Sequence, residues 1–248
     1  MIKGIYSSAS GMTPHSVELE VIANNLANID TTGFKKDNIF LQVLDQEQAL
    51  LRQNAGYGDL SSIDARQYTD YGQGSFRTTG DPLDVALLGD GFFAAQTPDG
   101  VRYTRNGNFS LSQEGTIQTS DGFPVLGTNG AIKIENWSKV SSGDITISPR
   151  GEVKVDKTVI GQLRIVDFPK PYALDKDGNS FFVPKEGVAP VEVGATTLVK
   201  QGILEESNID AIEEMVKMIE LNRSYETDQH MTTIQDGTLD KAMEIGRV

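Results

Sequence analysis

The stretch VIANNLANIDTTGFKK, residues 21–36, has the pattern of an amphipathic helix that comes to an end. Apolar residues recur along this region at spacings of three and four, at Leu19, Ile22, Leu26 and Ile29. This periodicity predicts a heptad-like seam on one helix face. The stretch then stops at Thr-Thr-Gly-Phe. If Gly33 takes the left-handed conformation that ends many helices, Phe34 would pack on Ile29 as a hydrophobic clasp.

Three amides, Asn24, Asn25 and Asn28, interrupt this helix end, although asparagine is a mediocre helix former. Their spacing places them in a polar stripe beside the apolar seam. Such amides either face water, or they bond across a helix pair and fix its register at a cost in stability. The residues alone leave both interpretations open.

The helical pattern extends upstream to Ile5, with Pro14 inside it. Proline is tolerated in the first turn of a helix, and Thr13 is a suitable N-cap. We therefore expect either one kinked helix or a short helix that leads into a longer one from about Pro14.

A second long helix is predicted within ESNIDAIEEMVKMIELNRSYE, residues 206–226. Ser207 followed by Asp210 resembles the spacing of a capping box. The apolar residues Ile212, Met215, Val216 and Ile219 form one face. Bare apolar seams on two terminal helices indicate that the helices pair with each other or with other copies of the chain.

Between about residues 70 and 205, turn-forming pairs such as Asp99-Gly100 and Asn106-Gly107 alternate with short β-type runs such as GFFAAQT and VRYT. We predict an α+β fold, in which the N- and C-terminal helices pair as a coiled-coil-like domain around an antiparallel β-rich domain. The expected domains are residues 1–36 with 204–248 (helical), 37–75 (a linker) and 76–203 (β-rich). In the linker, part of IFLQVLDQEQALLRQ, residues 39–53, is expected to be helical.

Composition and motifs argue against several functions. The formal net charge of −13 does not suit a nucleic-acid binder, and the sequence has no basic cluster beyond the pair Lys35-Lys36, which we interpret as ordinary surface. The chain has no cysteine, no window of membrane-spanning length and no apolar run of a secretory signal. His15 and His230 are isolated, and DKDGNSFFVPKE lacks the glycine that a calcium loop needs at its sixth position. We therefore predict no catalytic residue, metal or cofactor, and no membrane insertion.

Three stretches, in the same order along the chain, resemble the flagellar rod and hook family of bacteria: VIANNLANIDTTGFKK, residues 80–127 and residues 201–226. They look like the N-terminal signature, the β-domain and the C-terminal helix of that family, and the resemblance covers nearly the whole chain. The length and the opening MIKGIYSSASGM are most similar to the proximal rod branch, with the distal rod branch as the close alternative and the hook proteins further off.

The resemblance implies a structural, non-enzymatic subunit of the flagellar basal-body rod. Family members pack their terminal helices as a coiled coil inside a helical, hollow, torque-transmitting shaft that crosses the periplasm. The implied partners are other copies of the chain, other rod proteins and the flagellar type III export apparatus, which needs no cleaved signal peptide.

Carried over to this sequence, the assembly motif comprises Leu19, Ile22, Asn24, Asn25, Leu26, Ala27, Asn28, Thr32, Gly33 and Phe34. Its C-terminal counterpart comprises Glu205, Ser207, Asn208, Glu214, Met215, Ile219, Arg223 and Tyr225. The alternative from a different class is a β-rich module or enzyme that acts on carbohydrate or peptidoglycan, and it would need a concave site with clustered acids and aromatics.

Overall fold

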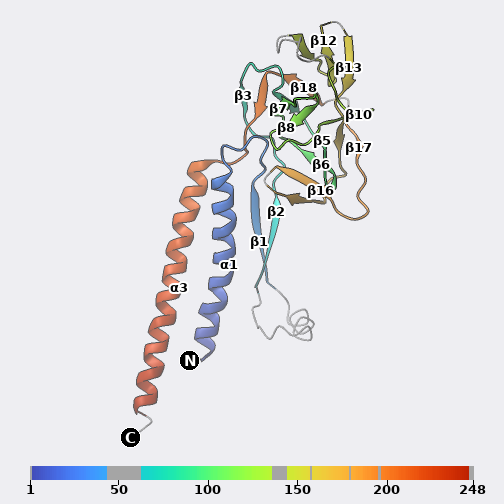
Figure 1. The fold of residues 1–248 in the computed structure, drawn as a ribbon. Helices are drawn as coiled ribbons and strands as arrows, with labels where there is room; N and C mark the ends of the chain where they lie inside the picture. Colours follow the sequence, from blue (N-terminus) through green and yellow to red (C-terminus); the bar gives the residue numbers. More distant parts are fainter. Residues whose placement is uncertain are drawn as a thin grey trace. The chain divides into compact units, whose positions relative to one another are not determined.

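In the residues that the structure describes, the fold comprises two long helices and a set of short strands (Figure 1). The computed structural model describes residues 2–43, 63–135, 144–156, 158–178, 180–194 and 197–245. By its contacts, the chain divides into two compact units. The helical unit comprises Met1–Ala27, Lys36–Tyr71 and Ile209–Val248, and the β-rich unit comprises Asn28–Lys35 and Gly72–Asn208.

In the helical unit, α1 (Ile2–Ala27) and α3 (Ala211–Ile245) lie side by side (Figure 1). They run antiparallel, because Asn25 near the end of α1 contacts Glu214 near the start of α3, while the earlier α1 residue His15 has its Nε2 3.9 Å from Oδ2 of the later α3 residue Asp228. Helix α1 continues through Pro14 as one element. Of the two alternatives for this region, the structure therefore supports a single helix.

The helical unit also holds an antiparallel strand pair, β1 (Asp37–Val43) and β2 (Ile63–Thr69). The expected partial helix of the linker therefore does not include Ile39–Val43. A strand forms here because all seven residues of β1 pair in register with β2, whereas an isolated helix of a few turns is marginal in water. The rest of that stretch, residues 44–53, lies outside the described residues.

The β-rich unit is built from antiparallel strands, as the turn spacing predicts. Its largest sheet has the order β15 (Leu174–Asp177), β16 (Phe181–Pro184), β6 (Gly100–Thr104), β5 (Phe92–Thr97), β14 (Ile165–Asp167) and β17 (Val191–Glu192). A second sheet contains β11 (Ile145–Ile147), β12 (Glu152–Val155) and β13 (Thr158–Gln162). The remaining pairs are β18 (Leu198–Gln201) with β4 (Val85–Leu88), β19 (Ile203–Glu205) with β3 (Phe76–Thr78), β7 (Phe109–Leu111) with β8 (Ile117–Thr119), and β9 (Leu126–Gly127) with β10 (Gly130–Ala131).

One hydrophobic core holds these sheets together. It includes the fully buried side chains of Val85, Phe93, Ile117 and Val153. At Gly107 the backbone passes so close to the core strand β4 that an added Cβ would lie 1.7 Å from the Val85 carbonyl oxygen. Glycine is therefore required at this position for close packing.

Candidate assembly site

Asn25 joins three elements of the helical unit. Its side chain is buried, and its Nδ2 donates to the Asp37 carbonyl of β1 at 2.8 Å while its Oδ1 accepts from the Asp37 N–H at 3.0 Å. The same Nδ2 lies 3.3 Å from Oε2 of Glu214 on α3. Of the two interpretations of the amides, bonding across a helix pair therefore holds for Asn25, and the helix pair belongs to a single subunit.

The other two amides behave differently, so the expected stripe of three is wrong. Asn24 is exposed. Asn28 is buried in the β-rich unit, where its carbonyl oxygen accepts from the Thr31 N–H at 3.1 Å and its Oδ1 accepts from the Thr31 hydroxyl at 3.2 Å. The stripe fails because α1 ends at Ala27, before Asn28.

The face that α3 turns toward α1 is not its apolar face. Other than Lys217, the shielded α3 residues recur at spacings of three and four, at Ala211, Glu214, Met218, Leu221, Tyr225, Asp228, Thr232 and Gln235. Half of these residues are polar or charged. On α1, Val21 and Ile22 are buried, and Leu19 and Leu26 are half-buried.

The four apolar residues of the start of α3 are instead exposed, by 72% for Ile212, 45% for Met215, 49% for Val216 and 53% for Ile219. We call these four residues the outer face. Ile212 lies two residues before Glu214 and Ile219 five residues after it, which is roughly the opposite side of a helix with about 3.6 residues per turn. The bond between Glu214 and Asn25 thus fixes a rotation of α3 that points the outer face away from α1.

Helix α3 is capped by Asp210 rather than by Ser207, which corrects the expected capping box. The Asp210 carboxylate accepts from the N–H groups of Ile212 and Glu213 at 2.9 and 3.1 Å. One turn on, Glu213 and Lys217 form an ion pair of 2.6 Å. Their hydrogen bond lowers the pKa of the Glu213 carboxyl and raises the pKa of the Lys217 ammonium. Acidic groups at this end also suit the helix dipole.

Gly33 has the expected left-handed conformation, with φ of 68°, but the predicted helix clasp is wrong. Its N–H donates to the carbonyl of Glu205 in β19 at 2.8 Å. An added Cβ would lie 2.4 Å from the carbonyl carbon of Arg105 and from the amide nitrogen of Asn106. Glycine is required here because two distant backbone segments of the β-rich unit meet at this point.

A buried ion network surrounds this contact. Lys35 Nζ lies 2.5 Å from Glu205 Oε1, and Arg105 Nη1 lies 3.3 Å from Glu205 Oε2. The exposed fractions of the three side chains are 1%, 0% and 5% in the order Lys35, Glu205 and Arg105. Lys35 also donates to the Gly72 carbonyl at 2.7 Å, and the Gly74 N–H donates to Glu205 at 3.2 Å. The interpretation of the Lys35-Lys36 pair as ordinary surface is therefore wrong for Lys35.

The residues on either side of Gly33 also contact other parts of the β-rich unit. Phe34 is buried, with Lys176 Nζ 4.2 Å from the centre of its ring. Lys176 also donates to the Lys35 carbonyl at 2.5 Å. The Thr32 hydroxyl donates to Asn106 Oδ1 at 2.7 Å. The second half of the opening stretch is therefore a docking segment of the β-rich unit.

The structure separates the predicted assembly residues into two groups. Those buried or half-buried in their own unit are Leu19, Ile22, Asn25, Leu26, Asn28, Thr32, Gly33, Phe34, Glu205, Ser207, Asn208, Glu214 and Tyr225. Those exposed are Asn24, Ala27, Met215, Ile219 and Arg223. Ile212 and Val216 belong with the exposed group, and their helical spacing with Met215 and Ile219 is the signal that identifies them. The part of any of these residues in assembly stays a prediction.

No three His, Asp or Glu side chains in the described ranges gather closely enough to hold a metal ion. None of the helices, within the same residues, is both long and apolar enough to cross a membrane.

Three protein-family models of flagellar rod and hook proteins match the chain, in the order of its N-terminal helix, its β-rich unit and its C-terminal helix. Residues 5–35 match "Flagella basal body rod protein", residues 86–155 match "Flagellar hook protein FlgE/F/G D1 domain" and residues 200–245 match "Flagellar basal body rod FlgEFG protein C-terminal".

Relatives of known name match over almost the full length. The flagellar basal-body rod protein FlgG of Bacillus subtilis is 32% identical over 100% of both chains. The rod proteins FlgF of Rhizobium meliloti and of Caulobacter vibrioides are 31% and 33% identical, over 98% and 92% of this chain and 98% and 91% of their own. The chain therefore belongs to the flagellar basal-body rod family, and it is a structural rod subunit. These relatives do not favour the carbohydrate-acting alternative.

Proposed function

We propose that this protein is a subunit of the proximal rod, which polymerises helically into a hollow, torque-transmitting shaft. Membership of the rod family supports the part of this proposal that places the protein in the rod. The observation that carries the mode of assembly is the outer face of α3, where Ile212 is 72% exposed. Four adjoining large apolar side chains on one helix face indicate an interaction surface. The outer face then contacts a neighbouring subunit.

The α1–α3 pair is proposed to act as a coiled coil. The spacing of three and four residues along the shielded side of α3 is the coiled-coil repeat. A polar pair at one core position of a coiled coil fixes register and partner number at a cost in stability. Asn25 and Glu214 occupy such a position, so the inner contact sets the register and the apolar outer face supplies the contact between subunits.

The choice of the proximal rod rests on length. The alignment with FlgF of Rhizobium meliloti spans 248 positions over 98% of this chain, so it needs few gaps in this chain. The alignments with FlgG of Bacillus subtilis and of Borreliella burgdorferi span 268 and 272 residues, so they need gaps in this chain. The distal rod is the second candidate, since the identities are similar.

By family membership, the partners of the protein are other copies of itself and other rod proteins of the basal body. We infer from the same family membership that the protein is exported to the periplasmic rod through the flagellar type III export apparatus. The terminal helices would carry the assembly contacts, and the β-rich unit would form a separate domain of the subunit.

The direct test places the full-length protein in a strain whose own copy is deleted. Ile219→Glu puts a charge on the outer face, and Ser224→Glu puts the same side chain on an exposed polar position about 140° around the same helix as a control. Motility and the number of rods in purified basal bodies should fall sharply for the first variant and stay normal for the second. Both should melt like the native protein, since both positions are exposed. Normal rods from Ile219→Glu would reject the assembly face.

A further inference from the structure

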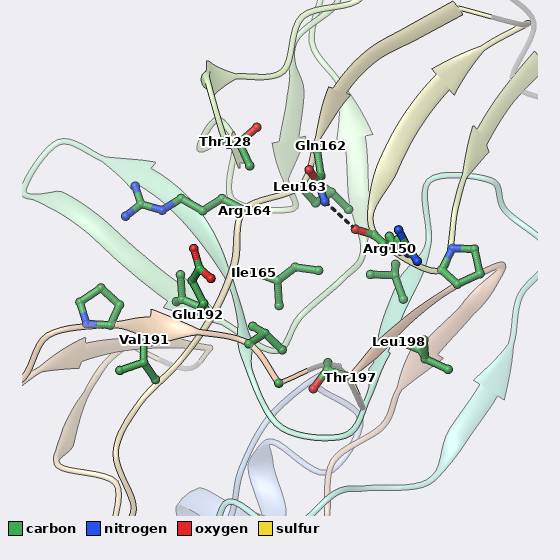
Figure 2. A pocket seen from close by; sticks show the side chains of 16 residues that line it. Thr128, Arg150, Gln162, Leu163, Arg164, Ile165, Val191, Glu192, Thr197 and Leu198 are labelled. Atoms are coloured by element: carbon green, nitrogen blue, oxygen red, sulfur yellow. Dashed lines mark hydrogen bonds between the residues drawn. The ribbon is translucent and has the colours of Figure 1, made fainter.

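A groove of about 860 Å³ opens beside β17, one edge strand of the six-stranded sheet (Figure 2). Its apolar lining includes the buried Leu163 and Val199 and the half-buried Ile165. Val191 and Leu198 add exposed apolar surface at its border, each 45% accessible. A concave surface with exposed apolar side chains is suited to bind another molecule.

The border of this groove is basic. Arg150 and Arg164 are both exposed and lie on either side of Ile165 (Figure 2). Neither guanidinium forms an ion pair with a carboxylate of the described residues. Among the described residues, Glu192 is the one acidic residue that lines the groove. The groove is thus apolar in its centre and carries a net positive charge, although the whole chain has a formal net charge of −13.

A complementary hollow of about 570 Å³ lies near the other edge of the same sheet, where β15 turns into β16. Three exposed carboxylates, of Asp99, Asp121 and Asp177, surround it. Phe123 and Phe181 supply its apolar surface, with ring centres 5.8 Å apart. Arg102 pairs with Asp177 at 2.6 Å, which leaves the hollow with net negative charge.

The groove adjoins the edge strand β17, and the hollow lies in the other half of the same sheet, between the turn that joins β5 to β6 and the turn that joins β15 to β16. A contact between two unlike surfaces of the same protein does not close on itself, and it propagates as a ring or a helix. Edge strands are also the parts of a sheet most prone to meet another chain. A helical polymer needs such a heterologous contact, and this sheet carries opposite charges on its two sides.

We propose that the groove beside β17 binds the acidic β15–β16 region of a second copy of this chain. The inference rests on the proposed function and goes further, because it names a second contact between subunits and the two faces that form it. Arg150 and Arg164 pair with the aspartates of the neighbour, and the two apolar surfaces exclude water from the pairs. Such a contact weakens as salt is raised.

Cross-linking tests the pairing, since the native chain has no cysteine. Val191→Cys marks the groove and Asp121→Cys marks the hollow. The two full-length variants carry different tags, are produced together and are oxidised within purified basal bodies. The expected product is a disulfide dimer that contains both tags, which neither variant forms when it is produced alone. Absence of that product, or equal amounts of dimers between identical variants, would overturn the proposal.

An exchange of charges tests whether the proposed ion pairs stabilise the contact between subunits. Arg150→Glu with Arg164→Glu, and separately Asp99→Arg with Asp121→Arg, should each lower the number of rods by about tenfold or more, as loss of close interfacial charge pairs does. Combining all four substitutions should restore rods, because the charges are exchanged. Lys133→Glu with Arg77→Glu reverses two exposed basic residues that line neither the groove nor the hollow, and this pair should have little effect.

The outcomes separate the inference from the function on which it rests. If the native chain enters rods and Ile219→Glu does not, but both charge reversals assemble normally, only the edge-to-edge contact is rejected. If the native chain itself is absent from basal bodies, the proposed function fails and the contact fails with it.

Discussion

Asn25 Nδ2 on α1 lies 3.3 Å from Glu214 Oε2 on α3, and the two residues are 1% and 2% exposed. This contact joins the two ends of the chain inside one subunit. It uses one amide of the asparagine-rich motif for internal register, and it leaves the outer face of α3 free. Register within the subunit and contact between subunits therefore fall to opposite sides of one helix.

Replacement of Asn25 by Leu should destabilise the helical unit by about 3 kcal/mol, since each buried polar group left without a partner costs about 1–3 kcal/mol. The N–H and carbonyl of Asp37 both lose the Asn25 amide, and the Glu214 carboxylate loses it too but keeps Lys217 at 3.5 Å. Urea unfolding followed by helical circular dichroism measures the loss. An unchanged midpoint would show that the amide is not needed for the helix pair.

Asn25→Asp should make the same pair depend on pH. The substitution keeps the size of the side chain but places a second carboxylate beside Glu214. Two neighbouring carboxylates raise the pKa of one of them, so the repulsion is relieved as that group takes up a proton. The variant should lose more stability at neutral pH than at mildly acidic pH. Thermal melts across that range test this, and a deficit that does not change with pH would contradict it.

Glu205→Gln should destabilise the β-rich unit by about 3 kcal/mol or more, as is usual when one partner of a buried ion pair is removed. Lys35 and Arg105 would remain buried without their common counter-charge. The neighbouring Glu206→Gln is the matched control. Glu206 is 41% exposed and pairs with Arg77 at 3.3 Å, so its loss should cost at most about 1 kcal/mol. Equal denaturation midpoints for the two variants would show that the buried ion network does not stabilise the β-rich unit.

Gly33→Ala and Gly122→Ala separate backbone strain from close packing. Both glycines are left-handed, with φ of 68° and 84°, but a Cβ at Gly122 would meet nothing within 4 Å. Gly122→Ala should therefore cost about 1–2 kcal/mol, the conformational penalty alone. Gly33→Ala should cost on the order of 4 kcal/mol, because two backbones must also move apart. Similar costs for both would show that the close approach at Gly33 is unimportant.

Tyr172 should ionise at a higher pH than a free tyrosine. Burial raises the pKa of its phenol, and so does its 3.0 Å hydrogen bond to Asp167. Because the unfolded chain ionises first, this group lowers the stability of the fold once pH rises above about 10, the ordinary pKa of tyrosine. Ultraviolet absorbance titration of the native protein and of Tyr172→Phe should differ by one late-ionising tyrosine. A difference spectrum that titrates like free tyrosine would contradict the burial.

The order of elements could be predicted from the sequence because it depends on local patterns. Apolar spacing marked both helices, and Asx-Gly pairs marked the turns between strands such as β5 and β6. The rotation of α3 could not be predicted. Ile212, Val216 and Ile219 define an apolar face, but nothing in their spacing says what covers it. That depends on Glu214, whose partner lies on the other helix.

The site around Gly33 shows the same limit. A local pattern, Gly33 followed by Phe34, predicted the left-handed backbone correctly and its purpose wrongly. The residues that need the glycine, Glu205 and Arg105, come from distant strands. Lys35 has no feature in the sequence that distinguishes it from an ordinary surface lysine, since its burial depends on the same two residues.

Electron cryo-microscopy of intact basal bodies that contain this protein tests the central claim most directly. The account predicts density for the chain in the rod, with Ile212 and Ile219 packed on a neighbouring subunit and the Asn25–Glu214 contact kept inside each subunit. A rod that lacks the chain, or one in which the outer face of α3 points into solvent, would contradict it.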